Sequence, residues 1–132
     1  MATWQRFEDI EAWQKARRLS AAIHELSAEG KWSKDYAFVR QIRAAALSVM
    51  SNIAEGFERD GNKEFAHFVS IAKGSAGEVR SQLYAALDVH YCTQLDFDRL
   101  YVLATEISRM LAGLIEYLCR TDIKGLKFPD KG

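Results

Sequence analysis

The sequence predicts an all-α protein, an up-down-up-down antiparallel four-helix bundle with left-handed packing. Three observations support this fold. Apolar residues recur every three or four positions through four long segments, which is typical of amphipathic helices. The only proline is Pro129, so the strongest helix breaker is absent from all four segments. Short runs separate the segments, two of them with glycine, and such short connections favour antiparallel neighbours.

Residues 8–28 and 34–59 are expected to form the first two helices. Acidic residues at the start of the first helix complement its dipole, and Gly30 follows its end. Ser33 is the expected N-cap of the second helix. The apolar stripes are Ala12, Ala16, Leu19, Ile23 and Leu26 in the first helix, and Val39, Ile42, Ala46, Val49, Ile53 and Phe57 in the second.

Residues 63–91 and 97–120 are expected to form the last two helices, with Asn62 capping the third and Thr93 or Asp96 the fourth. Two glycines, Gly74 and Gly77, fall within the third helix, where they cost about 2 kcal/mol relative to alanine. We expect a close approach of the second helix, at Ala45 and Ser48, to offset that cost. Residues 1–121 then form one bundle domain, and 122–132 a flexible C-terminal tail.

Charge and hydropathy exclude several classes of protein. The chain has 18 basic and 18 acidic residues, so no global field attracts it to nucleic acid or to an anionic membrane. The longest uncharged stretch in the helical part, residues 44–54, is well short of the roughly 20 residues needed to span a bilayer. The first residues lack the pattern of a secretory signal. We therefore expect a soluble, cytoplasmic protein without a membrane partner.

Motifs for catalysis or for cofactor binding are missing. There is no GxGxxG, GxxxxGK[ST], GxSxG or HExxH sequence. Glu64 and His67 form one Glu-x-x-His pair, whereas a di-iron bundle needs two. We therefore expect no enzymatic activity, no catalytic or metal site, no cofactor and no small-molecule substrate.

Two rows of polar residues lie beside the apolar stripes of the second and third helices. Helix positions that flank a core stripe face either solvent or a neighbouring helix or subunit. The rows therefore indicate either a solvated flank or a hydrogen-bonded seam, within one bundle or between subunits. Their members are Ser48, Asn52 and Glu55 in the second helix, and Ser75, Glu78 and Gln82 in the third.

Basic side chains interleaved with tyrosine could hold phosphates and stack bases. Arginine and tyrosine are equally enriched at subunit interfaces, and helix-surface charges are often only solvated. The sequence therefore allows a nucleic-acid site, a subunit interface or a solvated surface. The candidate nucleic-acid contacts are Lys73, Arg80 and Tyr84 on one face of the third helix, Arg40 and Arg43 on the second helix, and Lys15, Arg17 and Arg18 on the first.

Three segments resemble a bacterial four-helix-bundle family, the one named for proteins encoded by intervening sequences in large-subunit ribosomal RNA genes. The resemblance covers about residues 7–118. The matching segments are Phe7-x5-Trp13-Gln14-x-Ala16, Ser48-x3-Asn52-Ile53-Ala54-Glu55-Gly56, and Phe65-x2-Phe68-x3-Ala72-x2-Ser75-x2-Glu78-x3-Gln82.

This resemblance implies a bundle that assembles into a ring of five subunits. A related branch is similar to the accessory variability protein of diversity-generating retroelements, which works with nucleic acid. The hypothesis is thus a non-enzymatic, homo-oligomeric scaffold, a pentamer that binds RNA or DNA. A protein-interaction adaptor without a nucleic-acid role is the alternative.

Overall fold

The computed structural model describes residues 4–121, and these residues form four long α-helices and no β-strand, which confirms the predicted all-α class. The expected tail, residues 122–132, lies outside the described residues. The helices are α1 (Glu11–Ser27), α2 (Tyr36–Glu58), α3 (Asn62–Asp88) and α4 (Gln94–Arg120). Two 3-10 turns, η1 (Phe7–Asp9) and η2 (Trp32–Lys34), precede α1 and α2.

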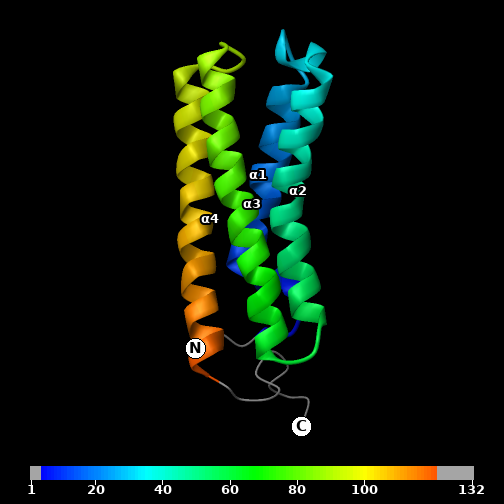
Figure 1. Cartoon of the computed structure of the whole chain (residues 1–132), viewed down its shortest axis with the longest axis vertical. Helices are drawn as coiled ribbons and strands as arrows, with labels where there is room; N and C mark the ends of the chain where they lie inside the picture. The colour runs from blue at the N-terminus through cyan, green and yellow to red at the C-terminus, as the bar shows by residue number, and fades with distance from the viewer. Residues whose placement is uncertain (1–3, 122–132) are drawn as a thin grey trace.

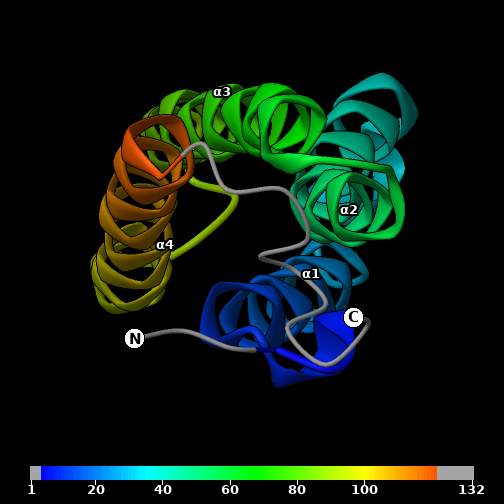
Figure 2. The same cartoon turned by 90° about the horizontal axis from the view of Figure 1, so that it is seen from below.

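The four helices run up, down, up and down along a common axis (Figure 1). Seen along that axis, they follow one another around the bundle in chain order, so that α1 is diagonal to α3 and α2 is diagonal to α4 (Figure 2). Helix α3 packs extensively against both α2 and α4, whereas α1 and α4 contact each other least among the neighbouring pairs. The α3 helix is therefore the central element of the more tightly packed half.

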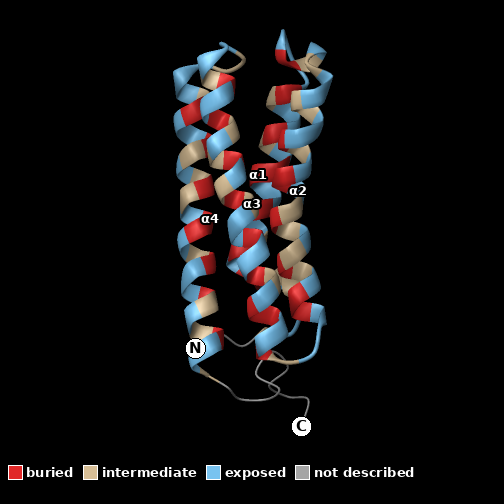
Figure 3. Cartoon of the chain, in the orientation of Figure 1, coloured by how far each residue is buried: buried red, intermediate tan, exposed pale blue. Residues whose placement is uncertain are grey.

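Most residues of the predicted apolar stripes are buried, whereas Leu26 and Val39 are only half-buried, and Ile10 and Trp32 join the core from outside the stripes. Buried residues recur along every helix between exposed ones (Figure 3). Several inward positions carry alanine, and Ala46, Ala72, Ala76 and Ala104 are completely inaccessible to solvent. Small residues there bring the helix axes close, and larger residues such as Ile53, Leu83 and Leu111 fill the space between.

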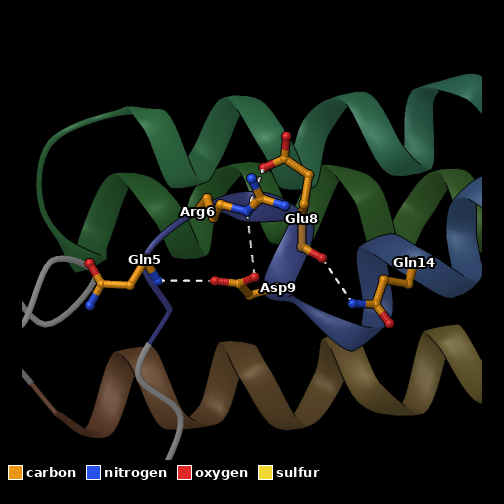
Figure 4. Close-up of polar contacts among 5 residues, drawn as sticks. All are labelled: Gln5, Arg6, Glu8, Asp9 and Gln14. Atoms are coloured by element: carbon orange, nitrogen blue, oxygen red, sulfur yellow. Dashed lines mark hydrogen bonds and ion pairs between the residues drawn. The ribbon is translucent and has the colours of Figure 1, made fainter.

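Helix α1 begins at Glu11, three residues later than predicted, because the preceding residues form η1 and a local polar network (Figure 4). The Asp9 carboxylate accepts from the Gln5 backbone N–H at 3.3 Å and pairs with Arg6 at 3.6 Å. The Gln14 side chain donates to the Glu8 carbonyl at 2.8 Å. Local side-chain bonds of this kind compete with a helical backbone, and they divide the predicted helix in two.

Helix α2 is capped by Asp35 and not by Ser33 as predicted. The Asp35 Oδ1 accepts from the Phe38 backbone N–H at 3.3 Å, while the Ser33 hydroxyl donates backward to the Gly30 carbonyl at 2.7 Å. Trp32, which directly precedes Ser33, is fully buried and packs against Phe38 and Tyr91. The burial of Trp32 sets the path of the turn, and residue propensity alone does not reveal it.

Both ends of α3 differ from the prediction. Asn62 is the first helical residue and not the cap, and its side-chain amide donates to the Thr121 carbonyl at 3.0 Å, which joins the start of α3 to the end of α4. At the other end, α3 stops at Asp88 because His90 adopts a left-handed φ of 64°. Two backbone bonds, Tyr91 N–H to Ala86 O and His90 N–H to Leu87 O, complete a Schellman motif there.

Helix α4 begins at Gln94, three residues before the predicted start. Thr93 is its N-cap, and the Thr93 hydroxyl oxygen accepts from the Asp96 backbone N–H at 3.1 Å. Of the two residues that the sequence offered for this cap, Thr93 has the role. Asp96 lies in the first turn, where its charge complements the helix dipole.

Among the glycines of α2 and α3, Gly56 packs tightly against the neighbouring helix, whereas Gly74 and Gly77 do not. A Cβ added to Gly56 would lie 2.8 Å from Phe68 Cβ and 3.0 Å from Phe65 Cδ1. A Cβ at Gly74 would meet nothing within 4 Å, and one at Gly77 would meet only the Arg80 guanidinium, at 3.6 Å. The expected packing of these two glycines against α2 is therefore wrong.

Candidate functional site

The polar rows of α2 and α3 meet at one point, a cluster of three half-buried side chains that we call the serine seam: Ser48, Asn52 and Ser75. The Ser75 hydroxyl donates to Ser48 Oγ at 2.9 Å. The Asn52 amide donates to both Ser48 Oγ and the Ser48 carbonyl, each at 2.9 Å. The seam thus connects the two helices within a single chain.

The other three members of the rows do not cross between helices. Glu55 pairs with Arg59 of its own helix at 3.2 Å, and Gln82 donates to Glu78, also of its own helix, at 3.4 Å. Because α2 and α3 are antiparallel, Glu55 and Glu78 lie on opposite sides of the Ser48–Ser75 contact, about 15 Å apart along the bundle at 1.5 Å per residue. The two carboxylates are therefore too far apart to act on one group.

A groove of about 520 Å³ lies on the opposite side of α3, between α3 and α4. Gly74 and Gly77 face this groove, so the missing side chains leave it open. The α4 side contributes small or apolar groups, which carry no sequence signal for a binding site. We call this feature the α3–α4 groove, and its lining residues are Ser70, Lys73, Gly74, Gly77, Arg80, Ala112 and Ile115.

Two cations, Lys73 and Arg80, line the α3–α4 groove. Neither forms an ion pair with a carboxylate within residues 4–121, in contrast to Lys15, Arg59 and Arg99. The Arg80 Nε atom is buried and has no hydrogen-bond partner in the described part of the chain. A desolvated donor without an acceptor is costly, and the side chain that carries it lines the groove.

An aromatic cluster lies next to the groove, one helical turn beyond Arg80. Tyr84 is 50% exposed, and its ring centroid lies 4.9 Å from that of buried Phe97 and 5.4 Å from that of Tyr101. A hydrogen bond with Tyr101 raises the pKa of Tyr84 above its ordinary value. Tyr84 is thus an exposed ring whose orientation is held by contacts from α4.

The remaining basic candidates lie on other faces, and several have partners in the structure. Arg43 donates to Ser27 Oγ at 2.9 Å and to the His24 carbonyl at 3.1 Å, so it caps the C-terminal end of α1. Lys15 pairs with Glu106 of α4 at 3.3 Å. The other three are Arg17, which stacks over Trp13 with its guanidinium carbon 5.9 Å from the ring centroid, and the exposed residues Arg18 and Arg40.

Other classes of site find no support among residues 4–121. No group of three or more histidine, cysteine or acidic side chains is arranged to hold a metal ion there. No helix in that range combines the length and the apolar character needed to cross a membrane.

The sequence matches a family model described as 23S rRNA-intervening sequence protein, over residues 8–113. The match spans most of the chain, from η1 to the second half of α4. The chain belongs to this family. The family resemblance noted in the sequence is therefore confirmed.

A solved structure shares the fold. It is a protein of unknown function from the S23 ribosomal protein family of Bacteroides thetaiotaomicron, 21% identical, with a TM-score of 0.73. The similarity covers 80% of this chain and 95% of that chain. No curated protein sequence matches at a significant level. Membership in the family and the helical fold are thus shown.

Proposed function

We propose that this chain is a non-enzymatic, homo-oligomeric scaffold that assembles as a ring of five subunits in the cytoplasm and binds RNA or DNA. The single observation that carries the nucleic-acid part is the α3–α4 groove, in which Lys73 and Arg80 have no carboxylate partner within residues 4–121. Phosphate contacts of this kind supply most of the affinity in non-specific nucleic-acid binding.

The charge of the whole chain is not an argument against local binding. The 18 basic and 18 acidic residues cancel, but the salt bridges of the described residues engage many carboxylates on other faces. Groove cations without such partners produce a local positive potential even on a neutral protein. The groove is therefore the preferred site among the basic candidates, ahead of Arg40, Arg43 and the Lys15–Arg18 cluster.

The test compares two double variants that each remove two positive charges. Lys73→Ala with Arg80→Ala empties the groove of cations, whereas Arg18→Ala with Arg40→Ala removes exposed charges from α1 and α2. Fluorescence anisotropy with labelled RNA should show weaker binding and a flatter salt dependence only for the groove variant. Equal losses in both variants would contradict the groove as the site.

The self-association part is supported by an exposed face around the serine seam. Leu47 of α2 is 49% exposed and Ile71 of α3 is 41% exposed, and both lie beside the Ser48–Ser75 contact. A closed ring is built from heterologous contacts, in which one face of each subunit meets a different face of the next. We assign the α2–α3 face to one side of that contact.

Light scattering measures the assembly directly. We expect a mass of about five times the 15.0 kDa of one chain for the wild type, and a smaller species when Leu47 and Ile71 are both changed to glutamate. Val102→Glu is the matched control, because Val102 is 64% exposed on the outer face of α4. A wild-type monomer would defeat the scaffold proposal. A stable ring that binds no RNA or DNA would favour the protein-interaction adaptor.

A further inference from the structure

We infer that the α3–α4 groove and the Tyr84 cluster together bind single-stranded nucleic acid, with the sugar–phosphate backbone along the groove and a base stacked on Tyr84. This inference rests on the proposed nucleic-acid function and specifies the form of the ligand. Three features carry it: the continuity of the groove with the aromatic cluster, the open backbone at the glycines, and the fixed orientation of the Tyr84 ring.

The continuity follows from helix geometry. Lys73, Arg80 and Tyr84 lie on the same side of α3, and Arg80 and Tyr84 are four residues apart, which places them one above the other. From Ser70 to Tyr84 the surface extends about 21 Å at 1.5 Å per residue. Cations therefore line the groove up to the point where the aromatic cluster begins.

The glycines give the backbone of a ligand room to approach. Gly74 is exposed in the middle of a long helix, and its missing Cβ faces open space. No packing within residues 4–121 accounts for glycine at this position. Glycine allows the close approach of a ligand backbone. Lys73 and Ser70 line the groove next to Gly74, where both side chains could contact phosphate oxygens.

The Tyr84 ring is suited to stacking because it is half exposed and is held by ring contacts from α4. Buried Phe97 and half-buried Tyr101 both contact it, with interplanar angles of 56° and 71°. Phe97 and Tyr101 also stack on each other, with their ring centroids 5.2 Å apart. A base that stacks on such a ring costs little side-chain entropy, and stacking on aromatic side chains is how proteins select unpaired bases.

A duplex cannot use these features together. Its bases are stacked on one another, so none is available to Tyr84, and only its phosphates could reach Lys73 and Arg80. The site should therefore prefer single strands over duplexes of the same length. A second protein chain lying in the groove is the competing occupant, and it would use the glycines and the apolar α4 wall but would give no preference between strands.

The experiment measures the dissociation constants of a labelled single-stranded RNA and of the matching duplex by fluorescence anisotropy, using the full chain in its native assembly. Wild-type protein should bind the single strand roughly ten-fold or more tightly than the duplex. Tyr84→Leu should weaken single-strand binding by about the same factor and leave duplex binding unchanged. Tyr84→Phe keeps the ring, so it should retain single-strand affinity.

Tyr36→Leu is the matched control, because Tyr36 is 70% exposed at the start of α2 and far from the groove. Its single-strand affinity should equal that of the wild type. Equal wild-type affinity for single strand and duplex, or an unchanged single-strand affinity in Tyr84→Leu, would overturn the inference while nucleic-acid binding stands. No binding of either probe would overturn the proposed function itself, and the inference with it.

Discussion

The Ser75 hydroxyl of α3 donates to the Ser48 hydroxyl oxygen of α2 at 2.9 Å, and this oxygen also accepts from the Asn52 amide. One atom thus connects three side chains at the middle of the α2–α3 hairpin. The contact fixes the axial register of the two antiparallel helices, because a shift of either helix along its axis would break the hydrogen bond.

Removing the Ser75 hydroxyl should lower the free energy of unfolding by about 0.5–1.5 kcal/mol, the net value of a partly buried hydrogen bond. Urea denaturation of Ser75→Ala measures this change. Asn52→Ala should cost a similar amount, and the double variant should deviate from additivity because both groups share Ser48 Oγ. Ser81→Ala, at an exposed α3 position, is the control, and a loss there of the same size would remove any special role from the seam.

Gly56→Ala should destabilise the protein by about 1–3 kcal/mol, since its Cβ would overlap Phe68 Cβ at 2.8 Å and force α2 and α3 apart. Thermal unfolding followed by circular dichroism checks this. Gly113→Ala is the matched substitution in α4, where the new Cβ would meet nothing within 4 Å. It should stabilise by up to about 1 kcal/mol through helix propensity, and opposite signs for the two variants are the expected result.

Arg43→Ala should lower the free energy of unfolding by about 1–3 kcal/mol, because it removes two charge-assisted hydrogen bonds to the end of α1. Arg40→Ala, one turn earlier and exposed, should change stability by less than about 0.5 kcal/mol. The folded Arg43→Ala protein should bind RNA as the wild type does. Weaker RNA binding by the folded variant would show that Arg43 contributes to nucleic-acid binding.

His90→Gly should stabilise the protein by about 1 kcal/mol, because a β-carbon at a φ of 64° is strained and glycine is not. Chemical denaturation gives the value. Ala85→Gly, at an exposed right-handed position of the same helix, should cost about 1 kcal/mol. If both substitutions destabilise, His90 makes a compensating contact in solution.

Tyr91→Phe should lower the midpoint of thermal unfolding, since it removes the hydrogen bond from the Tyr91 hydroxyl to Asp35 Oδ2 at 2.9 Å but keeps the rings packed. That hydrogen bond raises the pKa of Tyr91 above its ordinary value of 10.0. A tyrosine whose pKa is raised in the folded state contributes stability below its ordinary pKa. This stabilisation is lost as the pH rises from the ordinary pKa through the raised one. The difference between wild type and Tyr91→Phe should therefore shrink above about pH 10, and a difference that is constant with pH would contradict this assignment.

The sequence alone determined the fold class and most of the helical core, for a physical reason. Burial in a helical bundle repeats with the period of the helix, so spacing alone predicts the inward positions of Ala16, Leu19, Ile42 and Ile53. The polar rows that contain Ser48, Asn52 and Ser75 were compatible with a solvated flank or with a hydrogen-bonded seam, and the structure places these three side chains in contact within one chain.

Only the tertiary structure decided the helix ends and the faces of the polar and basic residues. Asp35, His90 and Asn62 have their roles because of partners or backbone angles that spacing does not encode. The tertiary structure also decided the surroundings of the candidate basic residues. Arg43 forms hydrogen bonds with the end of α1, whereas Lys73 and Arg80 line a groove together with residues of α4. Helical periodicity reports which side of one helix is buried, but contacts between residues of different helices depend on how the helices pack.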